Sequence, residues 1–473
     1  MAETATRTEL LEPFLAENGL KDTNFFNGRL LTATDLVNAQ AASRGRDQQL
    51  GMGIGAGVVQ GLEVRLLNNG SDGKPPVLAV SKGLAFDRLG QAVALPQNVE
   101  VRLAKEKPVI SQNNGQNTFQ ACVIAGQNGE PLPGKGAYVF TARQATGFTG
   151  QAPRRGFGQA AKVEGCDRDL LREGVQFRLV ALDVNTLSKL PSATRTGLAQ
   201  LLQGADSTGL AGLQAQSKLR NWLAHACFGT EELAAWARDP FAFTADDFFG
   251  AAVRSPLDAY GIVDALTAQS LLDVCDVPLA LILWTPTGVK WADMWSVRRR
   301  PSTRPISAGW PLPVGERRRV EAEAVFQQFQ EQLIYLLARL TPGQSIAAHA
   351  TDLFRFLPPV GFLPVAQGAI RGFDPVAFVD LPHRDAEYID AGTVPALFEQ
   401  GQHFAPVDVT SDELIWMYQP WQNDKALDDG EAVRPYVVLA TGHMPHWATA
   451  RLDVARWDYS QYVDSGEIIS PAS

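Results

Sequence analysis

The sequence has few cysteines, and none of them is placed to form a metal or disulfide framework. There are four in 473 residues, far apart and without a CxxC pair: Cys122, Cys166, Cys227 and Cys275. Zinc sites bring paired cysteines and histidines close in sequence, and small secreted scaffolds are dense in cysteine. The sequence therefore indicates neither class of protein.

Long apolar runs are also missing. The longest, Val277–Trp284 (VPLALILW), is eight residues long, whereas a helix that crosses a bilayer needs about 20. The sequence begins with acidic residues where a signal peptide would be basic, and no long apolar stretch follows. We therefore expect no membrane insertion and no signal peptide, and we expect assembly in the cytoplasm. Val277–Trp284 is predicted to be a buried strand.

Motifs for binding nucleotides are incomplete. Residues 129–136 (GEPLPGKG) match G-x-x-x-x-G-K, but Gly136 stands where a phosphate-binding loop has the Ser or Thr that holds magnesium. A strand pattern follows it instead of a helix. The glycines of residues 51–57 follow a helix pattern and lead into a strand, which is the reverse of a dinucleotide site. We interpret the two segments as a hairpin turn and a helix stop.

Histidines and acidic pairs do not complete a catalytic site. His443 and His446 are close in sequence, but they lack the HExxH pattern or neighbouring carboxylates of a metal site. His225 lies in a helical pattern near Cys227, which favours a core histidine over a catalytic pair. Two acidic pairs are more typical of turns and caps than of a glycosidase: Asp246-Asp247 and Asp428-Asp429. We therefore predict no enzyme activity and no catalytic, cofactor-binding or metal-binding residue.

The net charge of −9 argues against nucleic-acid binding by the whole chain, because such proteins present a basic surface. A local exception is a cluster of seven arginines: Arg298, Arg299, Arg300, Arg304, Arg317, Arg318 and Arg319. Protein docking or ion pairs within the chain are favoured over nucleic-acid binding as the role of this cluster. The acidic stretch Asp424–Glu431 is a candidate partner for it on a neighbouring subunit.

Strand and helix patterns predict an α+β fold of several domains, with small β-sandwich-like or barrel-like modules and a mainly helical middle region. Residues 1–110 are predicted to hold a helix capped by Thr32 or Thr34 and ending near Leu50, and then a β module. The helix is mostly polar, which places it across a surface or against a partner. Residues 111–187 are predicted to form a second β module of short strands joined by long loops.

The second half begins with residues 188–345, predicted to be mainly helical with one buried strand. It ends in a helix over residues 321–340, whose apolar side chains have the spacing of a helix seam. Residues 346–473 are predicted to form a C-terminal β-rich domain. Prolines between residues 356 and 364 favour an extended, polyproline-like path there. The best strand candidates are Ala377–Asp380, Glu413–Tyr418 and Tyr436–Thr441.

Blocks of residues along most of the chain carry a family resemblance. The first are NFFNGRLLTATDL, GVVQGLEV and SKGLAFDRLGQAVALP, all within residues 24–96. Further blocks follow in order at residues 165–182, 221–229, 275–300, 357–365 and 434–445. Together they resemble structural or accessory proteins that accompany extracellular contractile injection systems, the phage-tail-like particles of bacteria.

This resemblance implies a non-enzymatic structural protein at the baseplate of the particle, as part of a cage or as a fibre anchor. It implies contacts with other particle proteins and with threefold- or sixfold-related copies, in a particle that is released or docked on a membrane. It places a candidate interface at Phe25, Phe26 and Arg29, because exposed phenylalanines are costly in water. The alternative is that both phenylalanines close the local core. The arginine cluster supplies the other interface candidates, namely Arg298, Arg299, Arg300, Arg317, Arg318 and Arg319.

Two other functions stay open at this point. A glycan-binding or receptor-binding fibre component would line an open groove with aromatic side chains. The candidates for such a groove are Trp416, Tyr418, Trp421 and Trp447. A polysaccharide hydrolase would need two carboxylates facing each other across a cleft, about 5 to 9.5 Å apart.

Overall fold

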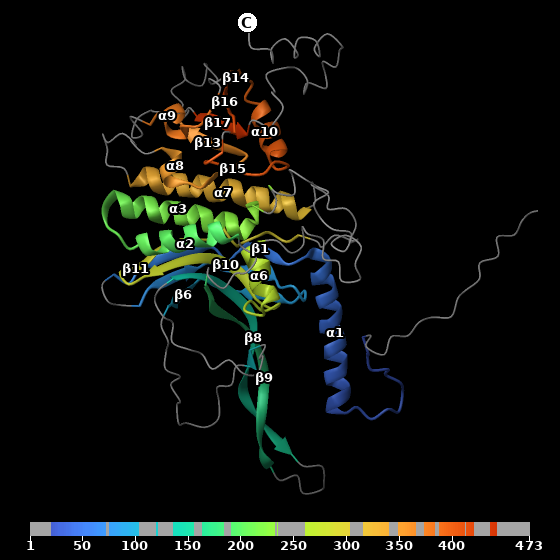
Figure 1. The fold of residues 1–473 in the computed structure, drawn as a ribbon. Coiled ribbons are helices and arrows are strands. Elements are labelled where there is room, and N and C mark those ends of the chain that lie inside the picture. The colour runs from blue at the N-terminus through green and yellow to red at the C-terminus, as the bar shows by residue number, and fades with distance from the viewer. Residues whose placement is uncertain are drawn as a thin grey trace, which may run out of the picture.

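The structure is a computed structural model of the 473-residue chain. It describes residues 20–71, 75–103, 120–121, 136–155, 163–183, 191–231, 234, 261–302, 316–339, 349–365, 373–383, 387–411, 413–420 and 436–441. The fold is a mixed α+β fold with several small, mainly antiparallel sheets (Figure 1), which confirms the predicted fold class.

The described helices and strands lie between residues 33 and 441, with most of the strands of the first half following α1 in one run (Figure 1). The helices are α1 (Ala33–Ile54), α2 (Ser192–Gly204), α3 (Gly209–Phe228), α6 (Ile262–Ala268), α7 (Glu316–Ala338), α8 (Ala350–Leu353), α9 (Pro375–Val379) and α10 (Thr393–Gly401). The strands of the first half are β1 (Gly57–Gly61), β2 (Val64–Asn68), β3 (Val77–Val80), β4 (Gly83–Phe86), β5 (Ala92–Leu95), β6 (Val99–Arg102), β7 (Gln120–Ala121), β8 (Gly136–Arg155) and β9 (Val163–Leu182). The later strands are β10 (Val277–Thr285), β11 (Gly288–Asp293), β12 (Phe356–Leu357), β13 (Val360–Pro364), β14 (Glu387–Ile389), β15 (Val407–Asp408), β16 (Ile415–Pro420) and β17 (Tyr436–Thr441).

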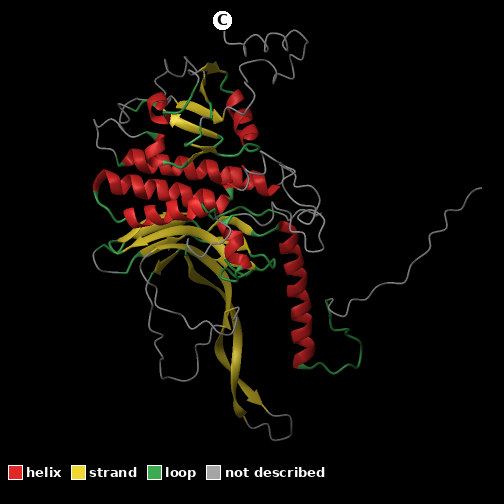
Figure 2. Ribbon diagram, in the orientation of Figure 1, coloured by secondary structure: helices red, strands yellow, loops and turns green. Residues whose placement is uncertain are grey.

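A five-stranded antiparallel sheet forms the middle of the molecule. Strand β8 pairs with β9 along its length, with β10 at its N-terminal end and with β7 further along, and β11 pairs with β10. Helices lie over one face of this sheet and a smaller, C-terminal sheet lies beyond them (Figure 2). The other face packs against the small strands of the N-terminal module through a shared core that includes Phe140, Ile282 and Val93.

Strand β10 shows why an unbroken apolar run folds as a buried strand here. Its side chains alternate between the two faces: Leu281 and Leu283 join the core under the helices, whereas Ala280 and Ile282 join the core of the N-terminal module. Because both faces are covered, apolar residues are needed at every position. The prediction of a buried strand is confirmed. The region predicted to have one strand has two, since β11 pairs with β10.

The predicted β module of the N-terminal region forms. It consists of two three-stranded sheets, with the orders β1-β4-β5 and β2-β3-β6. Strands β1 and β2 are separated at Leu62, which has a φ of 54°. Left-handed backbone of this kind interrupts a strand and redirects it, so that the chain enters the second sheet.

The second β module differs from the prediction. Instead of short strands joined by long loops, β8 and β9 are 20 residues each and pair from Ala137↔Leu182 out to Arg155↔Val163. The glycine-rich and proline-containing segment over residues 147–155 is part of β8 and does not form the expected loop. Its only described neighbour is β9, and a strand at the edge of a sheet tolerates glycine and proline.

The C-terminal half contains one wrong prediction and several confirmed ones. Ala377–Asp380 is not a strand: Asp374 accepts hydrogen bonds from the backbone of Val376 (2.9 Å) and Ala377 (3.2 Å) and caps α9. Pro375 at the first position of this helix also favours a helix start. The proline-rich residues 356–364 are extended as predicted, but they pair in sheets as β12 and β13. The predicted strand Tyr436–Thr441 is β17.

Helix α3 joins the central sheet to the C-terminal half. The Asn221 side chain accepts hydrogen bonds from the backbone N–H groups of Arg355 and Phe356, both at 2.8 Å, and donates one to the Phe356 carbonyl (3.0 Å). The Ser217 hydroxyl donates to the Leu353 carbonyl at 2.9 Å. These bonds satisfy backbone groups that would otherwise be buried without partners, so they fix how the C-terminal half sits on α3.

A buried ion pair fixes the other side of α3. Arg220 Nε donates to Asp293 at the end of β11 (2.5 Å), and a second guanidinium nitrogen lies 2.9 Å from Glu331 of α7. Asp293 also accepts hydrogen bonds from the Ser296 N–H (2.9 Å) and from the Gln328 amide (3.2 Å). The Arg220 and Asp293 side chains are almost completely buried, and the neighbouring guanidinium holds the pKa of Asp293 below its usual range despite burial.

Asp293→Asn tests this pair. The change leaves the Arg220 charge buried with reduced compensation, so we expect a loss of about 3–5 kcal/mol in the free energy of unfolding. The control is Arg300→Ala, which removes an exposed pair with Glu323 (2.8 Å) and should cost at most about 1 kcal/mol. Urea denaturation followed by tryptophan fluorescence measures both. Equal losses in the two variants would contradict the importance of the buried pair.

Candidate interaction surface

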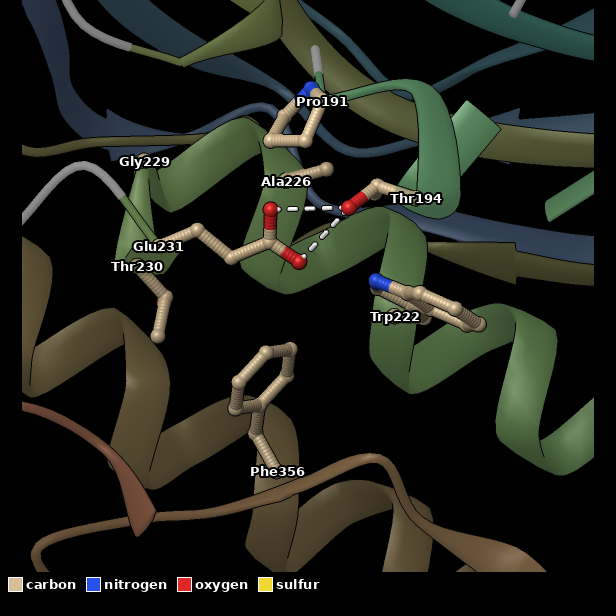
Figure 3. A pocket seen from close by; sticks show the side chains of 8 residues that line it. All are labelled: Pro191, Thr194, Trp222, Ala226, Gly229, Thr230, Glu231 and Phe356. Carbon is tan, nitrogen blue, oxygen red and sulfur yellow. Dashed lines mark hydrogen bonds between the residues drawn. The ribbon is translucent and has the colours of Figure 1, made fainter. Parts of the chain in front are cut away.

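A small pocket lies where the end of α3 approaches the start of α2 (Figure 3). Its interior volume of about 20 Å³ is room for about one water molecule. The Thr194 hydroxyl donates to the Glu231 carboxylate, at 2.9 and 2.8 Å from its two oxygens, so the acid beside the pocket is already engaged. The remaining lining residues are Pro191, Trp222, Ala226, Gly229, Thr230 and Phe356. A pocket of this size does not admit a sugar or a nucleotide.

His225 and Cys227 lie in the core under α3 and do not form a catalytic pair. Burial, and secondarily the charge of Arg318, lower the pKa of His225 to about 3, while burial raises the pKa of Cys227 to about 12. The imidazole is therefore neutral and the thiol protonated near pH 7. His225 Nδ1 lies 2.9 Å from the Thr230 hydroxyl. The prediction of a core histidine is confirmed.

Neither glycine-rich segment leads into a helix, as a phosphate-binding loop would. Gly136 begins β8, so the residues after it form a strand and supply no helix N-terminus. Helix α1 continues through Gly51 and Gly53 to Ile54, four residues beyond the predicted end near Leu50, and Gly55 is its C-cap. The segment does stop the helix, but later than predicted.

Arg298 and Arg299, two of the predicted interface arginines, bind backbone within the chain. Arg298 donates to the Gly61 carbonyl (2.5 Å), which joins it to the N-terminal module. Arg299 donates to the carbonyls of Trp295 (2.8 Å) and Ser296 (3.1 Å), and its guanidinium lies 4.6 Å from the ring centre of Phe228. These contacts brace the segment that follows β11.

Two more arginines of the cluster hold distant segments together. Arg317 forms an ion pair with Asp264 of α6 (2.7 Å), and the buried Arg318 donates to the Phe404 carbonyl after α10 (2.5 Å). The cluster therefore does not form one continuous docking patch, because four of its members serve contacts within the chain. Of these four arginines, Arg317 forms the predicted kind of ion pair within the chain, and the other three donate to backbone carbonyls.

The rest of the cluster is less involved in the fold. Arg300 pairs with Glu323 at 2.8 Å, with both side chains about half exposed, and Arg319 is exposed on α7. Arg304 and the acidic stretch Asp424–Glu431 lie outside the described residues. Of the predicted arginine patch, Arg300 and Arg319 thus remain as candidates for contact with another protein.

The N-terminal arm, which we define as residues 20–54, projects from the body of the molecule (Figure 1). Helix α1 forms its core and begins with a capping box, in which Thr32 and Asp35 exchange hydrogen bonds. Hydrogen bonds from Thr32 are the main reason that the pKa of Asp35 is lowered. Residues 20–31 fold back along the helix, where Asp22 pairs with Arg46 at 2.8 Å. The predicted cap at Thr32 is confirmed.

Close glycine contacts anchor the C-terminal end of the arm. A Cβ at Gly51 would lie 2.1 Å from the carbonyl oxygen of Gly90 in the β4–β5 turn. A Cβ at Gly57 would meet the backbone of Arg300 and Pro301 at 2.7 Å. The backbones therefore touch, and any larger side chain would separate them. The rest of α1 is mostly exposed, as expected for a polar helix that lies against a partner.

The arm exposes the predicted interface residues Phe25 and Phe26 and further apolar side chains. Phe25 and Phe26 are 53% and 62% exposed, so they do not close the local core. The Arg29 guanidinium lies 5.8 Å from the Phe26 ring centre and pairs with Asp35. Six further large apolar side chains of the arm are more than half exposed, and they are Leu30, Leu31, Leu36, Val37, Leu50 and Met52. Exposed apolar side chains this concentrated are typical of an interaction site.

A second projecting element is the outer half of the β8–β9 hairpin, which extends beyond the sheet (Figure 1). Phe148 and Leu171 face each other across the two strands, and both are exposed, as is Leu170. A two-stranded ribbon is only marginally stable in water without a third strand or a packed face. These residues were not predicted as a surface, because the glycines and proline near Phe148 are typical of a loop; apolar residues among charged ones were a signal at Leu170 and Leu171.

The described residues provide no site for the two other candidate functions. Tyr418 is fully buried and Trp416 packs against the same C-terminal core, so neither lines an open groove. The described residues hold no group of three or more His, Cys, Asp or Glu arranged to bind a metal ion. Several candidates lie outside the described residues: Trp421, Trp447, His443, His446, Asp246, Asp247, Asp428 and Asp429.

Comparison with known proteins adds no relative. No protein-family model matches this chain, and no curated protein is similar to it in sequence. In the part of the chain that the structure describes, every helix is too short or too polar to cross a bilayer. The N-terminal arm and the outer half of the β8–β9 hairpin, both projecting and partly apolar, are therefore the candidate functional surfaces.

Gly51→Ala tests how the arm is anchored. Because the added methyl group would collide with the backbone at Gly90, we expect α1 to open more often and trypsin to cleave after Arg44 and Arg46 at least about tenfold faster. Gly53→Ala is the matched control, since its Cβ would meet nothing within 4 Å and alanine favours the helix by about 0.5–1 kcal/mol. Similar cleavage rates in both variants would contradict this anchor.

His225→Gln tests the buried histidine. The pKa of His225 is about 3 in the folded chain and 6.5 as its ordinary value, so between these pH values only the unfolded chain binds the proton. Stability should fall as pH falls through this range, by about 2 kcal/mol between pH 7 and pH 5 from this residue. The glutamine variant should therefore lose about 2 kcal/mol less stability than the wild type between pH 7 and pH 5. Urea unfolding at both pH values measures it, and identical losses would rule out the histidine as the source.

Proposed function

We propose that this chain is a non-enzymatic structural component of a phage-tail-like contractile injection particle, associated with the baseplate as part of a cage or as a fibre anchor. It acts by holding copies of itself and other particle proteins in place. The copies are related by threefold or sixfold symmetry. The particle assembles in the cytoplasm, and is then released or docked on a membrane.

The observation that carries this proposal is the apolar surface of the N-terminal arm. Its large side chains lie in water in the isolated chain, and burying a phenylalanine or leucine contributes about 1.5–3 kcal/mol. An arm held at one end, with apolar residues along its free end, gains that contribution only against another surface. The same segment, FFNGRLL, carries the first block of the family resemblance.

The arrangement of the body supports the same role. The described polar side chains of the core are used to join elements, as Arg220, Asn221 and Arg318 do, and do not converge on an open pocket. A body fixed in this way gives the arm and the β8–β9 ribbon a defined starting position. Contacts between subunits need such rigid presentation, since ordering a flexible segment reduces affinity.

Incorporation into particles tests the proposal. The variant Phe26→Ser/Leu30→Ser removes two side chains worth about 3–6 kcal/mol of burial, so its amount in gradient-purified particles should fall at least about tenfold. Leu67→Ser is the control, because Leu67 is also more than half exposed but lies on β2 of the body, and its incorporation should equal that of the wild type. Quantitative mass spectrometry of the particle fraction measures all three. A wild-type chain that never sediments with the particle would refute the proposal.

A further inference from the structure

The turn between β4 and β5 holds the C-terminal end of α1, where the N-terminal arm joins the body. A Cβ at Gly90 of this turn would lie 2.0 Å from the Gln48 carbonyl oxygen and 2.6 Å from the Met52 nitrogen. Gly90 has a φ of +76°, a left-handed conformation that favours glycine. The turn therefore meets α1 backbone to backbone, and the arm stays anchored only while the turn keeps its shape.

A buried carboxylate, that of Asp87, fixes the shape of this turn. Its Oδ1 accepts hydrogen bonds from the backbone N–H groups of Leu89 and Gln91, both at 2.8 Å. The Asp87 N–H donates to the Gln91 carbonyl (3.0 Å), and the Asp87 carbonyl accepts from the Gly90 N–H (3.1 Å). Only 2% of the surface of Asp87 is exposed. The side chain therefore holds the turn closed from the inside.

The second oxygen of this carboxylate, Oδ2, is also buried, and no described residue donates a hydrogen bond to it. Burying an ionised carboxylate is costly unless it is paired or its oxygens are hydrogen-bonded. A proton on Oδ2 removes the charge and leaves the two bonds to Oδ1 in place, because a neutral carboxyl group still accepts through its other oxygen. The closed turn therefore favours the protonated form of Asp87.

The basic side chain next to this carboxylate in sequence is engaged elsewhere. Arg88 pairs with Asp264 of α6 at 3.2 Å, and Asp264 also pairs with Arg317 of α7 at 2.7 Å. On α1, the charged residues close to the contact are Arg44 and Asp47, and both are exposed. Among the described residues, these elements direct no cation at the buried carboxylate.

The segment between α6 and β10 adds a negative charge instead. It contacts the turn through a backbone hydrogen bond to the Val274 carbonyl (3.1 Å). Asp273 precedes Val274, whereas the charge of the buried Asp276 is balanced by Arg178. Burial is the main reason that the pKa of Asp87 is raised despite the two backbone hydrogen bonds, and the charge of Asp273 raises it further.

We propose that the β4–β5 turn is a proton-dependent clamp for the N-terminal arm, in which uptake of a proton by Asp87 favours the turn closed on α1 and release of the proton favours the open turn. An opened turn exposes the carboxyl group to water, where its pKa returns towards the ordinary 3.8. Above that pH the closed turn binds the proton more tightly than the open one, so the opening constant rises with pH. This inference does not depend on the proposed function, because it concerns only how the arm is attached.

The sign of this effect is opposite to the acid response of the body. His225 makes the body less stable as pH falls, because its pKa is lowered in the folded chain. Asp87 makes the turn more stable as pH falls towards 3.8, because its pKa is raised. A general loss of stability in acid therefore does not imitate the clamp.

Hydrogen exchange of the full chain, followed by mass spectrometry, tests the clamp. After correction for the intrinsic exchange rate, the opening constant of residues 87–91 and of the last turn of α1 should rise at least about threefold between about pH 4 and pH 7 in the wild type. In Asp87→Asn, a neutral amide keeps an acceptor for the N–H groups of Leu89 and Gln91. Its opening constant should stay at the low, acid value at every pH.

Two matched variants complete the experiment. Asp47→Asn removes an exposed acid close to the same contact and should keep the wild-type response to pH. Asp273→Asn removes the neighbouring negative charge and should make the response smaller. The proposal would be overturned by an opening constant that does not rise with pH in the wild type, by an equal rise in Asp87→Asn, or by loss of the rise in Asp47→Asn.

Discussion

The buried pair of Arg220 and Asp293 is the contact on which the rest of the molecule depends. It joins α3 to the end of β11, while the same guanidinium reaches Glu331 on α7. Two adjacent residues of α3 thereby connect the central sheet, the long helix α7 and, through Asn221, the segment at residues 355–356. A buried charge pair adds little net stability in general, but it excludes arrangements that would leave either charge alone. The body is therefore held in one geometry.

That geometry fixes the points from which the projecting elements extend. The arm and the β8–β9 ribbon start from fixed points, at Gly51 and Gly57 for the arm and at the pairing with β10 for the ribbon. Their apolar side chains cannot turn back into a core that is already filled. Stability and assembly are thus separate in this chain: polar contacts within the body define the fold, and apolar side chains outside it are available for neighbours.

The sequence predicted the elements whose signals are local. The Thr32 cap, the buried run of β10 and the strand Tyr436–Thr441 need only capping chemistry or alternating burial to be recognised. The cap of α9 at Asp374 was also local, but the short apolar stretch after it resembled a strand. The role of the arginine cluster was not predictable, because Arg317 and Arg318 meet partners 53 and 86 residues away in sequence. Only the folded chain brings such residues together. It also decides between the two alternatives that the sequence left open for Phe25 and Phe26, which are exposed and do not close the local core.

Amide hydrogen exchange of residues 20–54 is the most direct test of the central claim, that the arm exists to be covered by neighbours. The backbone of α1 should exchange quickly in the dilute monomer, since little packs against it, and should be protected in the native assembly. Body helices such as α3 should exchange alike in both states and serve as the internal reference. Equal exchange of the arm in the monomer and in the assembly would contradict the account.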